Sequence, residues 1–369
     1  MSKFEELINK LCPNGVEFKN LDKVCSVSTG NQLNKNKLLD DAKYPVINGG
    51  INPSGYWYEY NTDKDTITIS QGGASAGFVN YMKKPFWAGA HCYVVKLEDE
   101  SVNYRYLFYC LKSLENKLQQ YQQGAGIPSI SRKTIYENRI PVPPLEVQCE
   151  IVRILDNFTL LSAELSAELS ARQKQYEYYS KELFNFNDDV EFISLESIAD
   201  IGTGSSNTNE AVEDGQYPFY VRSQQVYYKN NYEYDDNSII TSGDGVGVGK
   251  IFHYTDGKYA LHQRAYRINI TNNKVNSKYF YYYMKSTFYD YIQKNAFNSS
   301  VTSIRRPMLN KYPVPILSLE KQNKIVNILE KFEKLCNDLS EGLPAEIEAR
   351  KKQYEYYRDK LLTFKELKS

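Results

Sequence analysis

Apolar residues recur at spacings of three and four along a central stretch of the chain, which is the period of one face of an α-helix. This face runs from Ile151 to Leu183. The pattern predicts one helix from Leu145 to Phe184, whose 40 residues span about 60 Å at about 1.5 Å per residue. Such a helix carries an apolar stripe that another element has to cover.

A second stretch with the same period lies near the end of the sequence. It begins at Ile325, passes Leu339 and resumes at Ile347. Gly342 and Pro344 interrupt it, and proline removes a backbone donor and clashes with the preceding turn, so we expect a break or kink there. Because each apolar stripe needs a partner, we predict that the two long helices pair as an antiparallel, coiled-coil-like strut.

The remaining sequence shows the shorter patterns of mixed α and β structure. Runs of β-branched and aromatic residues predict strands, and two glycine-rich loops follow two of these runs. Strands are expected at 66–70, 93–97, 238–242 and 265–270, glycine-rich loops at 71–79 and 243–252, and helices at 104–120 and 277–294.

The chain repeats itself. The stretch ARQKQYEYY at 171–179 returns as ARKKQYEYY at 349–357, with eight of nine positions identical. Further echoes join VNYRYLFYCLKS at 102–113 with VNSKYFYYYMKS at 275–286. Such self-similarity indicates two tandem copies of one unit.

The repeat and the helices together predict an α+β fold. It consists of two homologous mixed α/β globular domains joined by two long antiparallel helices, with pseudo-two-fold symmetry. We place the first globular domain at 1–140 and the second at 187–312, with helical regions at 141–186 and 313–369.

A tetrapeptide is doubled inside the first long helix, as SAELSAEL at 162–169. Four residues turn a helix by about 400° and advance it by about 6 Å. Adding or removing one copy changes the length while the apolar face turns little, so the tandem copies suit a molecular ruler. An accident of good helix formers explains them equally well.

Charge is balanced overall, with 45 basic and 45 acidic residues, but unevenly distributed. Segment 187–244 holds 2 basic and 12 acidic residues, whereas 245–312 holds 11 basic and 2 acidic. A basic face on a neutral protein still attracts polyanions. The alternative is that the two segments interleave in space and their charges pair.

Composition favours a cytoplasmic protein. No window of eighteen apolar residues is present, and the start MSKFEELINKL lacks a secretion signal. Six scattered cysteines without CxxC spacing indicate reduced thiols, and only three histidines argue against a metal site built from histidine.

No motif for catalysis stands out. The glycines at 243–249 follow the spacing G-x-G-x-G-x-G, which matches neither a dinucleotide fold nor a P-loop. They suit a tight loop needing positive φ, or a backbone that approaches a ligand closely. The Asn/Asp-Pro-Pro-aromatic stretch of adenine methyltransferases is absent. His91 and His262 fall at matching places in the two copies, which favours a shared structural role.

Residues suited to reading DNA bases gather near the glycine-rich loops. Arg and Lys read guanine, and Asn and Gln read adenine. Each alone is more often a solvated surface residue, but as a set they suggest two readers of different sequences. The DNA-binding candidates are Asn48, Gln71, Lys83, Lys84, Arg132, Lys133, Arg222, Gln224, Lys250, Gln263, Arg264, Arg267, Arg305 and Arg306.

The whole arrangement resembles the specificity subunit of type I restriction–modification enzymes. Each variable part is followed by Pro-x-Pro, a Gln, Ile-Val-x-Ile-Leu and a helix that ends in Lys-Gln-Tyr-x-Tyr-Tyr. The matching residues are Pro141, Pro143, Gln148, 151–155 and 175–179, and then Pro313, Pro315, Gln322, 325–329 and 353–357. The doubled tetrapeptide is also similar to one in such subunits, where its copy number sets target spacing.

This resemblance implies a DNA-recognition subunit without catalysis of its own. The globular domains are then target recognition domains, each reading one half of a bipartite double-stranded DNA target. Two methyltransferase (modification) subunits dock on the helices, bind S-adenosylmethionine and methylate adenine, while a restriction subunit cleaves with ATP and Mg²⁺. No cofactor and no metal is expected in this chain.

The repeated tyrosine stretch then becomes a docking surface displayed twice. The residues expected to be partly core and partly docking are Arg172, Lys174, Tyr176, Tyr179, Arg350, Lys352, Tyr354 and Tyr357. The break at 342–344 has no counterpart in the first helix, so the two surfaces need not be equivalent. Two other functions stay open: a scaffold whose globular domains bind protein or glycan, and an adenine methyltransferase of unusual motif.

Overall fold

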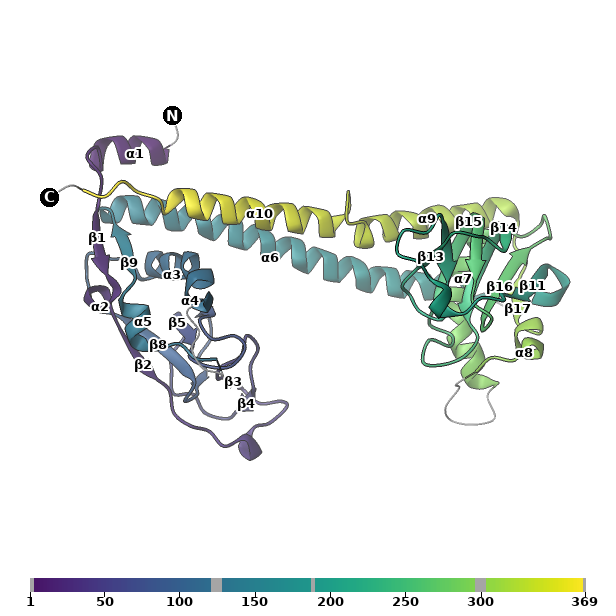
Figure 1. Cartoon of the computed structure of the whole chain (residues 1–369), viewed down its shortest axis with the longest axis horizontal. Coiled ribbons are helices and arrows are strands. Elements are labelled where there is room, and N and C mark those ends of the chain that lie inside the picture. The colour runs from purple at the N-terminus through teal and green to yellow at the C-terminus, as the bar shows by residue number, and fades with distance from the viewer. Residues whose placement is uncertain (1–2, 121–127, 187–189, 296–302, 368–369) are drawn as a thin grey trace. The chain divides into compact units, whose positions relative to one another are not determined.

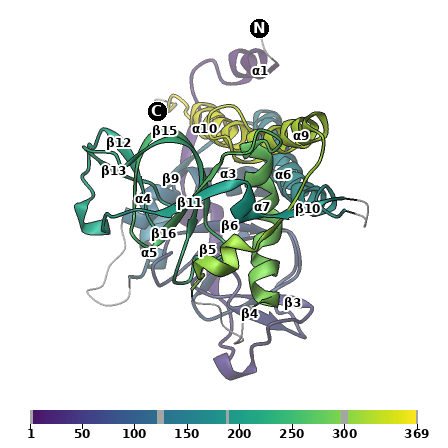
Figure 2. The same cartoon turned by 90° about the vertical axis from the view of Figure 1, so that its right-hand side faces the viewer.

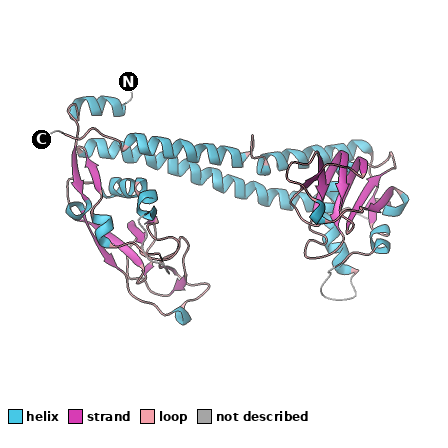
Figure 3. Ribbon diagram, in the orientation of Figure 1, coloured by secondary structure: helices cyan, strands magenta, loops and turns pink. Residues whose placement is uncertain are grey.

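The computed structural model describes residues 3–120, 128–186, 190–295 and 303–367 (Figure 1). Its contacts divide the chain into two compact units. Unit 1 comprises Met1–Glu164 together with Ile347–Ser369, and unit 2 comprises Leu165–Glu346. Strands and helices occur in both units (Figure 3).

Unit 1 contains a four-stranded antiparallel sheet, a three-stranded sheet and a two-stranded ribbon. The first has the order β2-β8-β5-β6, the second the order β4-β3-β7, and the ribbon pairs β1 with β9. The strands are β1 Glu17–Asn20, β2 Cys25–Thr29, β3 Tyr44–Ile47, β4 Gly55–Trp57, β5 Thr66–Ser70, β6 Val79–Met82, β7 Trp87–Ala88, β8 Cys92–Leu97 and β9 Arg139–Val142. Apart from the long helices, the helices of unit 1 are α1 Lys3–Leu11, α2 Leu21–Val24, η1 Lys35–Lys37, α3 Tyr104–Ser113, α4 Glu115–Gln120 and α5 Arg132–Tyr136.

Unit 2 contains a six-stranded sheet of order β11-β16-β14-β15-β12-β13 and the ribbon β10-β17. Helix α7 packs on the sheet through a shared apolar core (Figure 2). The strands are β10 Phe192–Ser194, β11 Ala199–Thr203, β12 Tyr217–Tyr220, β13 Tyr227–Lys229, β14 Tyr234–Ser242, β15 Phe252–Leu261, β16 Ala265–Ile270 and β17 Pro313–Pro315. The shorter helices are η2 Leu195–Ser197, η3 Thr208–Glu210, α7 Ser277–Lys294 and α8 Arg306–Asn310.

The two units share one topology. The order β2-β8-β5-β6 corresponds to β11-β16-β14-β15, and β4-β3-β7 corresponds to β13-β12-β15. Among the named strands, each unit has one parallel pair, β3 with β7 and β12 with β15. The ten-residue β15 therefore corresponds to both β6 and β7 of unit 1. The expected pair of homologous α+β domains is confirmed.

The long helices form where the apolar period predicts them. Helix α6 spans Leu145–Glu182, and α9 (Leu319–Asn337) and α10 (Leu343–Leu361) are separated by a short turn. Gly342 is required in that turn, because a Cβ there would lie 2.6 Å from the Lys334 carbonyl oxygen. The expected break is thus present.

Each unit contains part of the helix pairing. In unit 1, Phe158 of α6 stacks on Tyr357 of α10 with ring centroids 5.4 Å apart. Further along α6, Ser162 lines the same hollow as Lys351, which is earlier in α10, so the two helices run antiparallel. In unit 2, Tyr179 of α6 lies 6.1 Å from Phe332 of α9 between ring centroids.

A buried glutamine fastens each long helix to its globular part. Gln148 and Gln322 are both fully buried. The Gln148 Oε1 accepts the Asn103 N–H at 2.7 Å, and Gln322 Oε1 accepts the Asn276 N–H at the same distance. The amide nitrogen of each donates to two backbone carbonyls. Because Asn103 and Asn276 also cap α3 and α7, the side chain joins two helix starts.

A segment near the start of the chain pairs with a segment near its end within unit 1. The Val16 N–H donates to the Lys365 carbonyl, and the Leu367 N–H donates to the Val16 carbonyl, both at 2.9 Å. None of the helices in the described ranges combines the length and apolarity that a bilayer crossing requires. The six cysteines are free, and only Cys149 is exposed.

Candidate DNA-binding loops

In unit 1 the glycine-rich loop is held against two other segments at the end of β5. The Gln71 N–H donates to the His91 carbonyl, and the Ile130 N–H donates to the Gln71 carbonyl, both at 2.9 Å. The Tyr93 hydroxyl also donates to the Ile130 carbonyl at 3.1 Å. Three segments distant in sequence therefore share one edge of the domain.

Unit 2 repeats this device with different side chains. The Gly243 N–H donates to the Arg264 carbonyl at 2.9 Å, and the Ile304 N–H donates to the Gly243 carbonyl at 2.8 Å. The Tyr266 hydroxyl donates to the Ile304 carbonyl at 3.3 Å. The backbone frame is the same in both units, whereas the side chains that it presents differ.

Glycine is required at matching points of the two loops. Gly73 and Gly245 have φ of +84° and +83°, and Gly77 and Gly249 have φ of +91° and +70°. These values lie in the left-handed region that other residues rarely adopt. The glycine pattern therefore encodes loop shape, in keeping with the absence of a dinucleotide spacing.

The histidines do not occupy matching positions, contrary to our expectation. By its hydrogen bonds His91 corresponds to Arg264, and His262 corresponds to Gly89. His262 is buried, and its Nδ1 accepts the Arg264 N–H at 3.0 Å. Burial lowers the pKa of His262, and Arg222 and Arg264 lower it further. A neutral His262 that orients the Arg264 backbone is a structural role.

An arginine–aspartate cluster lies on the loop edge of unit 2. The Asp244 carboxylate accepts from Arg222 Nη1 at 2.5 Å and from Arg264 Nη1 at 3.2 Å. Partial burial on its own would raise the pKa of Asp244, but the two arginines hold it below its usual value. The Arg264 side chain remains 60% exposed, so it keeps donors for a ligand. Sequence reasoning missed Asp244, although its place inside the glycine loop was a usable signal.

The loop edge of unit 1 presents two uncharged amide side chains and one arginine. Asn48 is half-buried, and its Oδ1 accepts the His91 N–H at 3.0 Å. Gln71 is half-buried within the loop itself. Arg132 is exposed at the start of α5, with its guanidinium carbon 5.8 Å from the Tyr93 ring centroid. The structure thus brings Asn48, Gln71 and Arg132 to one edge.

Further candidates lie near these edges. Lys133 is exposed, 3.8 Å from Glu137, and Gln263 is exposed beside Arg264. Arg305 is exposed, and Arg306 matches Arg132 at the start of α8. The Arg306 Nη2 donates to the Ile201 carbonyl at 2.6 Å, which commits part of this guanidinium to the fold.

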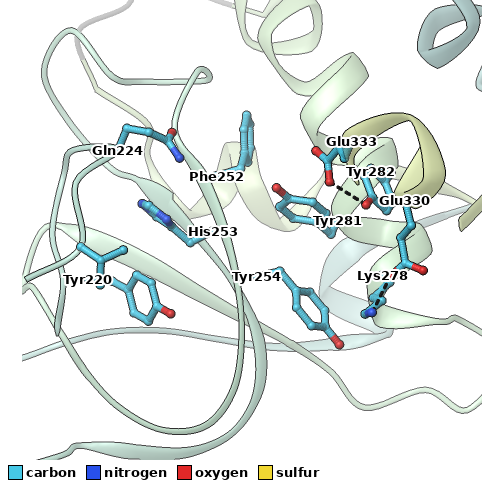
Figure 4. Close-up of a pocket in the computed structure, with 11 residues that line it drawn as sticks. Tyr220, Gln224, Phe252, His253, Tyr254, Lys278, Tyr281, Tyr282, Glu330 and Glu333 are labelled. Carbon is cyan, nitrogen blue, oxygen red and sulfur yellow. Dashed lines mark hydrogen bonds and ion pairs between the residues drawn. The ribbon is translucent and has the colours of Figure 1, made fainter. Parts of the chain in front are cut away.

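Four candidates lie elsewhere. Lys83 and Lys84 follow β6, and Lys83 lines a hollow formed with α3 and α6. Gln224 lines a hollow beside His253 (Figure 4). Lys250 is exposed at the far end of the glycine loop, with its ammonium 5.2 Å from the Tyr289 ring centroid.

Arg267 requires a correction. Its side chain is only 8% exposed, and it pairs with Asp200 at 2.7 Å and with Asp236. Burial opposes its charge, yet the two carboxylates raise the pKa of Arg267 above its usual value. A buried arginine held by two acids is part of the domain core, so we remove it from the DNA-binding candidates.

The acidic and basic segments of unit 2 interleave in part. Asp200, Asp236 and Asp244 of the acidic segment pair with Arg264 and Arg267 of the basic one. The alternative of paired charges therefore holds for these residues. Exposed basic residues remain at the loop edge, such as Arg264 and Arg305, and also elsewhere in the segment, such as Lys274 and Lys311.

The tyrosines of the repeated stretch lie on two sides of their helices. Tyr176 and Tyr354 are half-buried and pack against the cores of units 2 and 1. Tyr178 and Tyr356 are 60% and 61% exposed, although they were not among the docking candidates. Since residues two apart lie on nearly opposite sides of a helix, the helical period was the signal that could have found them.

The other docking candidates mostly lie on the helix surfaces. Tyr179 is 46% exposed, whereas Tyr357 is half-buried against Phe158. Tyr179 contacts Phe332 as Tyr357 contacts Phe158, so the two copies share this aromatic contact and differ in exposure. Arg172 pairs with Glu168 at 2.8 Å, Lys352 lies 3.8 Å from Glu348, Lys174 is exposed, and Arg350 Nη1 donates to Gln353 at 3.2 Å. Within the described ranges, no group of three or more His, Cys, Asp or Glu side chains could hold a metal ion.

Comparison with known proteins gives the same picture. The family model of the type I restriction modification DNA specificity domain matches twice, at residues 13–172 and 187–349. A putative type I restriction enzyme specificity subunit of Haemophilus influenzae is 30% identical over 380 residues, covering 95% of this chain and 96% of that protein. The specificity subunit of an Escherichia coli type I restriction enzyme is 32% identical, covering 73% of each chain.

A solved structure supports the fold. The type I restriction–modification S subunit from M. genitalium superposes with a TM-score of 0.64 at 20% identity, covering 98% of this chain and 99% of that one. The duplicated topology, the paired long helices and both matches to the specificity domain lead to one conclusion. The chain belongs to the family of type I restriction–modification DNA specificity subunits.

Proposed function

We propose that each globular domain of this chain reads one half of a bipartite DNA target, for a type I restriction–modification complex. Family membership makes DNA target recognition, and not catalysis, the work of this chain. It does not favour a scaffold for protein or glycan, or a methyltransferase of unusual motif.

The observation that carries the proposal is the duplicated loop edge. One backbone frame holds a glycine loop in both units, yet it presents Asn48, Gln71 and Arg132 in one and the Arg222–Asp244–Arg264 cluster in the other. A fixed frame with exchanged side chains is what two readers of different sequences need.

The side chains suit different bases. Arginine forms paired hydrogen bonds with guanine O6 and N7, and an aspartate accepts from the cytosine amino group. The cluster in unit 2 therefore suits a G·C base pair. Asparagine and glutamine pair with adenine N6 and N7, so the unit 1 edge suits an A·T pair beside a guanine read by Arg132.

The long helices carry the second part of the proposal. They set the distance between half-sites and dock two modification subunits, and a restriction subunit joins the complex. Support comes from Tyr178 and Tyr356, which expose the same residue type at matching points of the repeat. S-adenosylmethionine, ATP and Mg²⁺ bind the partner subunits, and the complex acts in the cytoplasm.

Sequencing the methylated bases of cells that carry this chain with its modification subunit tests the proposal. We expect methylated adenine in a motif of two specified parts separated by unspecified bases. Deleting one SAEL copy at 162–169 should change the number of unspecified bases and leave both specified parts intact. A continuous motif, or a motif that is independent of this chain, would contradict the proposal.

A further inference from the structure

Each unit has a hollow at the same place, between its sheet edge, the helix that follows the sheet, and a long helix. The unit 1 hollow is two adjoining spaces of about 600 and 450 Å³ that share Tyr81, Lys83, Arg105 and Thr159. The unit 2 hollow is a space of about 390 Å³ (Figure 4). It is lined by Tyr254 of β15, Lys278 of α7, and Glu330 and Glu333 of α9, among others.

The hollows are equivalent by sequence and by strand register. Tyr81 pairs with Ile67 in β5, and Tyr254 pairs with Ile239 in β14. An ion pair closes each hollow at matching positions, Arg105 with Asp156 at 2.7 Å and Lys278 with Glu330 at 2.5 Å.

The aromatic setting of this ion pair is also repeated. The Arg105 guanidinium carbon lies 4.2 Å from the Tyr81 ring centroid, and the Lys278 ammonium lies 5.7 Å from that of Tyr254. Cations over aromatic faces are held in place by the ring quadrupole. Equivalent elements therefore form the base of each hollow.

Their charges differ. The unit 1 hollow is lined by four basic residues, Lys83, Arg105, Lys112 and Lys351, and by two acidic ones, Asp65 and Asp156. The unit 2 hollow is lined by one basic residue, Lys278, and two acidic ones, Glu330 and Glu333, of which Glu333 pairs with Lys285 beside the hollow. At matching helix positions, Lys351 is replaced by Gln173, and Thr159 is replaced by Glu333.

Two cations of the unit 1 hollow remain available to a ligand. Arg105 is paired with Asp156 and Lys112 with Glu115. Lys83 and Lys351 are exposed, and in the described part of the chain no ion pair joins either to an acidic residue. Phe108, Leu160 and Ile347 add apolar side chains to the lining of the hollow.

We propose that the unit 1 hollow docks an acidic, partly apolar segment of a modification subunit, and that the unit 2 hollow lacks this complementarity. The inference rests on the proposed function, because that function supplies the partner. Charge complementarity at Lys83 and Lys351 selects acidic side chains. The apolar side chains favour a polypeptide over a DNA phosphate, which has no apolar surface to bury against them. One partner type therefore meets two different hollows.

The test measures binding of the modification subunit to the full chain at several salt concentrations, with sedimentation to resolve the two binding steps. The variant combines Lys83→Glu with Lys351→Glu. We expect one step to weaken by about tenfold or more, because two attractive charge pairs are lost and the reversed charges add repulsion. The remaining salt dependence of that step should fall. The control combines Lys10→Glu with Lys96→Glu, two exposed lysines of unit 1 outside the hollow, and should bind as the parent chain does.

A gain-of-function variant keeps the test decisive. Asp256→Lys with Gln173→Lys places cations in unit 2 at the positions that match Lys83 and Lys351. We expect the other binding step to tighten and become more salt-dependent. Equal weakening of both steps, equal effects of the control, or loss of DNA affinity with partner affinity unchanged would overturn the inference. A parent chain that binds neither DNA nor the modification subunit would instead contradict the proposed function.

Discussion

The buried glutamine at the start of α9 offers a sharp test of how the helices are anchored. Gln322→Met keeps the volume but removes three hydrogen bonds, from the Asn276 N–H and to the Lys274 and Leu317 carbonyls. The side chain is 0% exposed, so water cannot replace its partners. Each buried group left unpaired costs about 1–3 kcal/mol, partly offset by the apolar methionine. We expect the free energy of unfolding of unit 2 to fall by about 3 kcal/mol.

Hydrogen exchange is the suitable assay, because a chain of two units need not unfold in one step. Amides of α7 and of the first turns of α9 should exchange on the order of a hundredfold faster, which corresponds to about 3 kcal/mol. The matched variant Gln148→Met should produce the same change in α3 and the start of α6. Gln353→Met, on an exposed position, serves as the control. Equal acceleration in both units, or none in α7, would refute the anchoring role of Gln322.

Three further outcomes are expected. Arg267→Met should lower the free energy of unfolding of unit 2 by about 3 kcal/mol, because the partly buried Asp236 loses its arginine partner; an unchanged midpoint in urea would show the pair to be dispensable. The pKa of Asp244 is lower in the folded chain than in the unfolded chain, so its contribution to stability is present above the unfolded pKa and is lost as pH falls through the folded pKa. Asp244→Asn should therefore reduce the loss of stability at acid pH. An unaltered loss of stability at acid pH would contradict the arginine pairing. Tyr178→Ala with Tyr356→Ala should weaken modification-subunit binding by about tenfold or more without changing DNA affinity, measured by titration of each ligand, and equal loss of both would count against a docking surface.

Local pattern was enough to predict most of the elements. The 3.6-residue period gave the bounds of α6 to within two residues at its end, and α7 and β16 match the predicted ranges. The predicted helix at 104–120 is interrupted at Leu114. Periodicity reports which side faces the core and is insensitive to such a short break.

Pairing over long distances was beyond the sequence. Arg267 stands in a basic segment among other candidates, and only the register of β14 with β16 places Asp236 within reach of it. The histidines show the same limit, since alignment by residue type matched His91 with His262 while backbone hydrogen bonds match His91 with Arg264. The side chains that will contact bases depend on such register, so composition near a loop identified the region and not the individual residue.

In the proposed function, the two globular domains recognise their half-sites independently. The most direct test of this independence compares the methylated motif of cells carrying the parent chain with that of cells carrying Arg264→Ala, which removes an exposed donor from the unit 2 loop edge. We predict a motif that is relaxed at one position of one half, with the other half and the spacing unchanged. Relaxation in both halves, or a uniform fall in methylation at an unaltered motif, would contradict it.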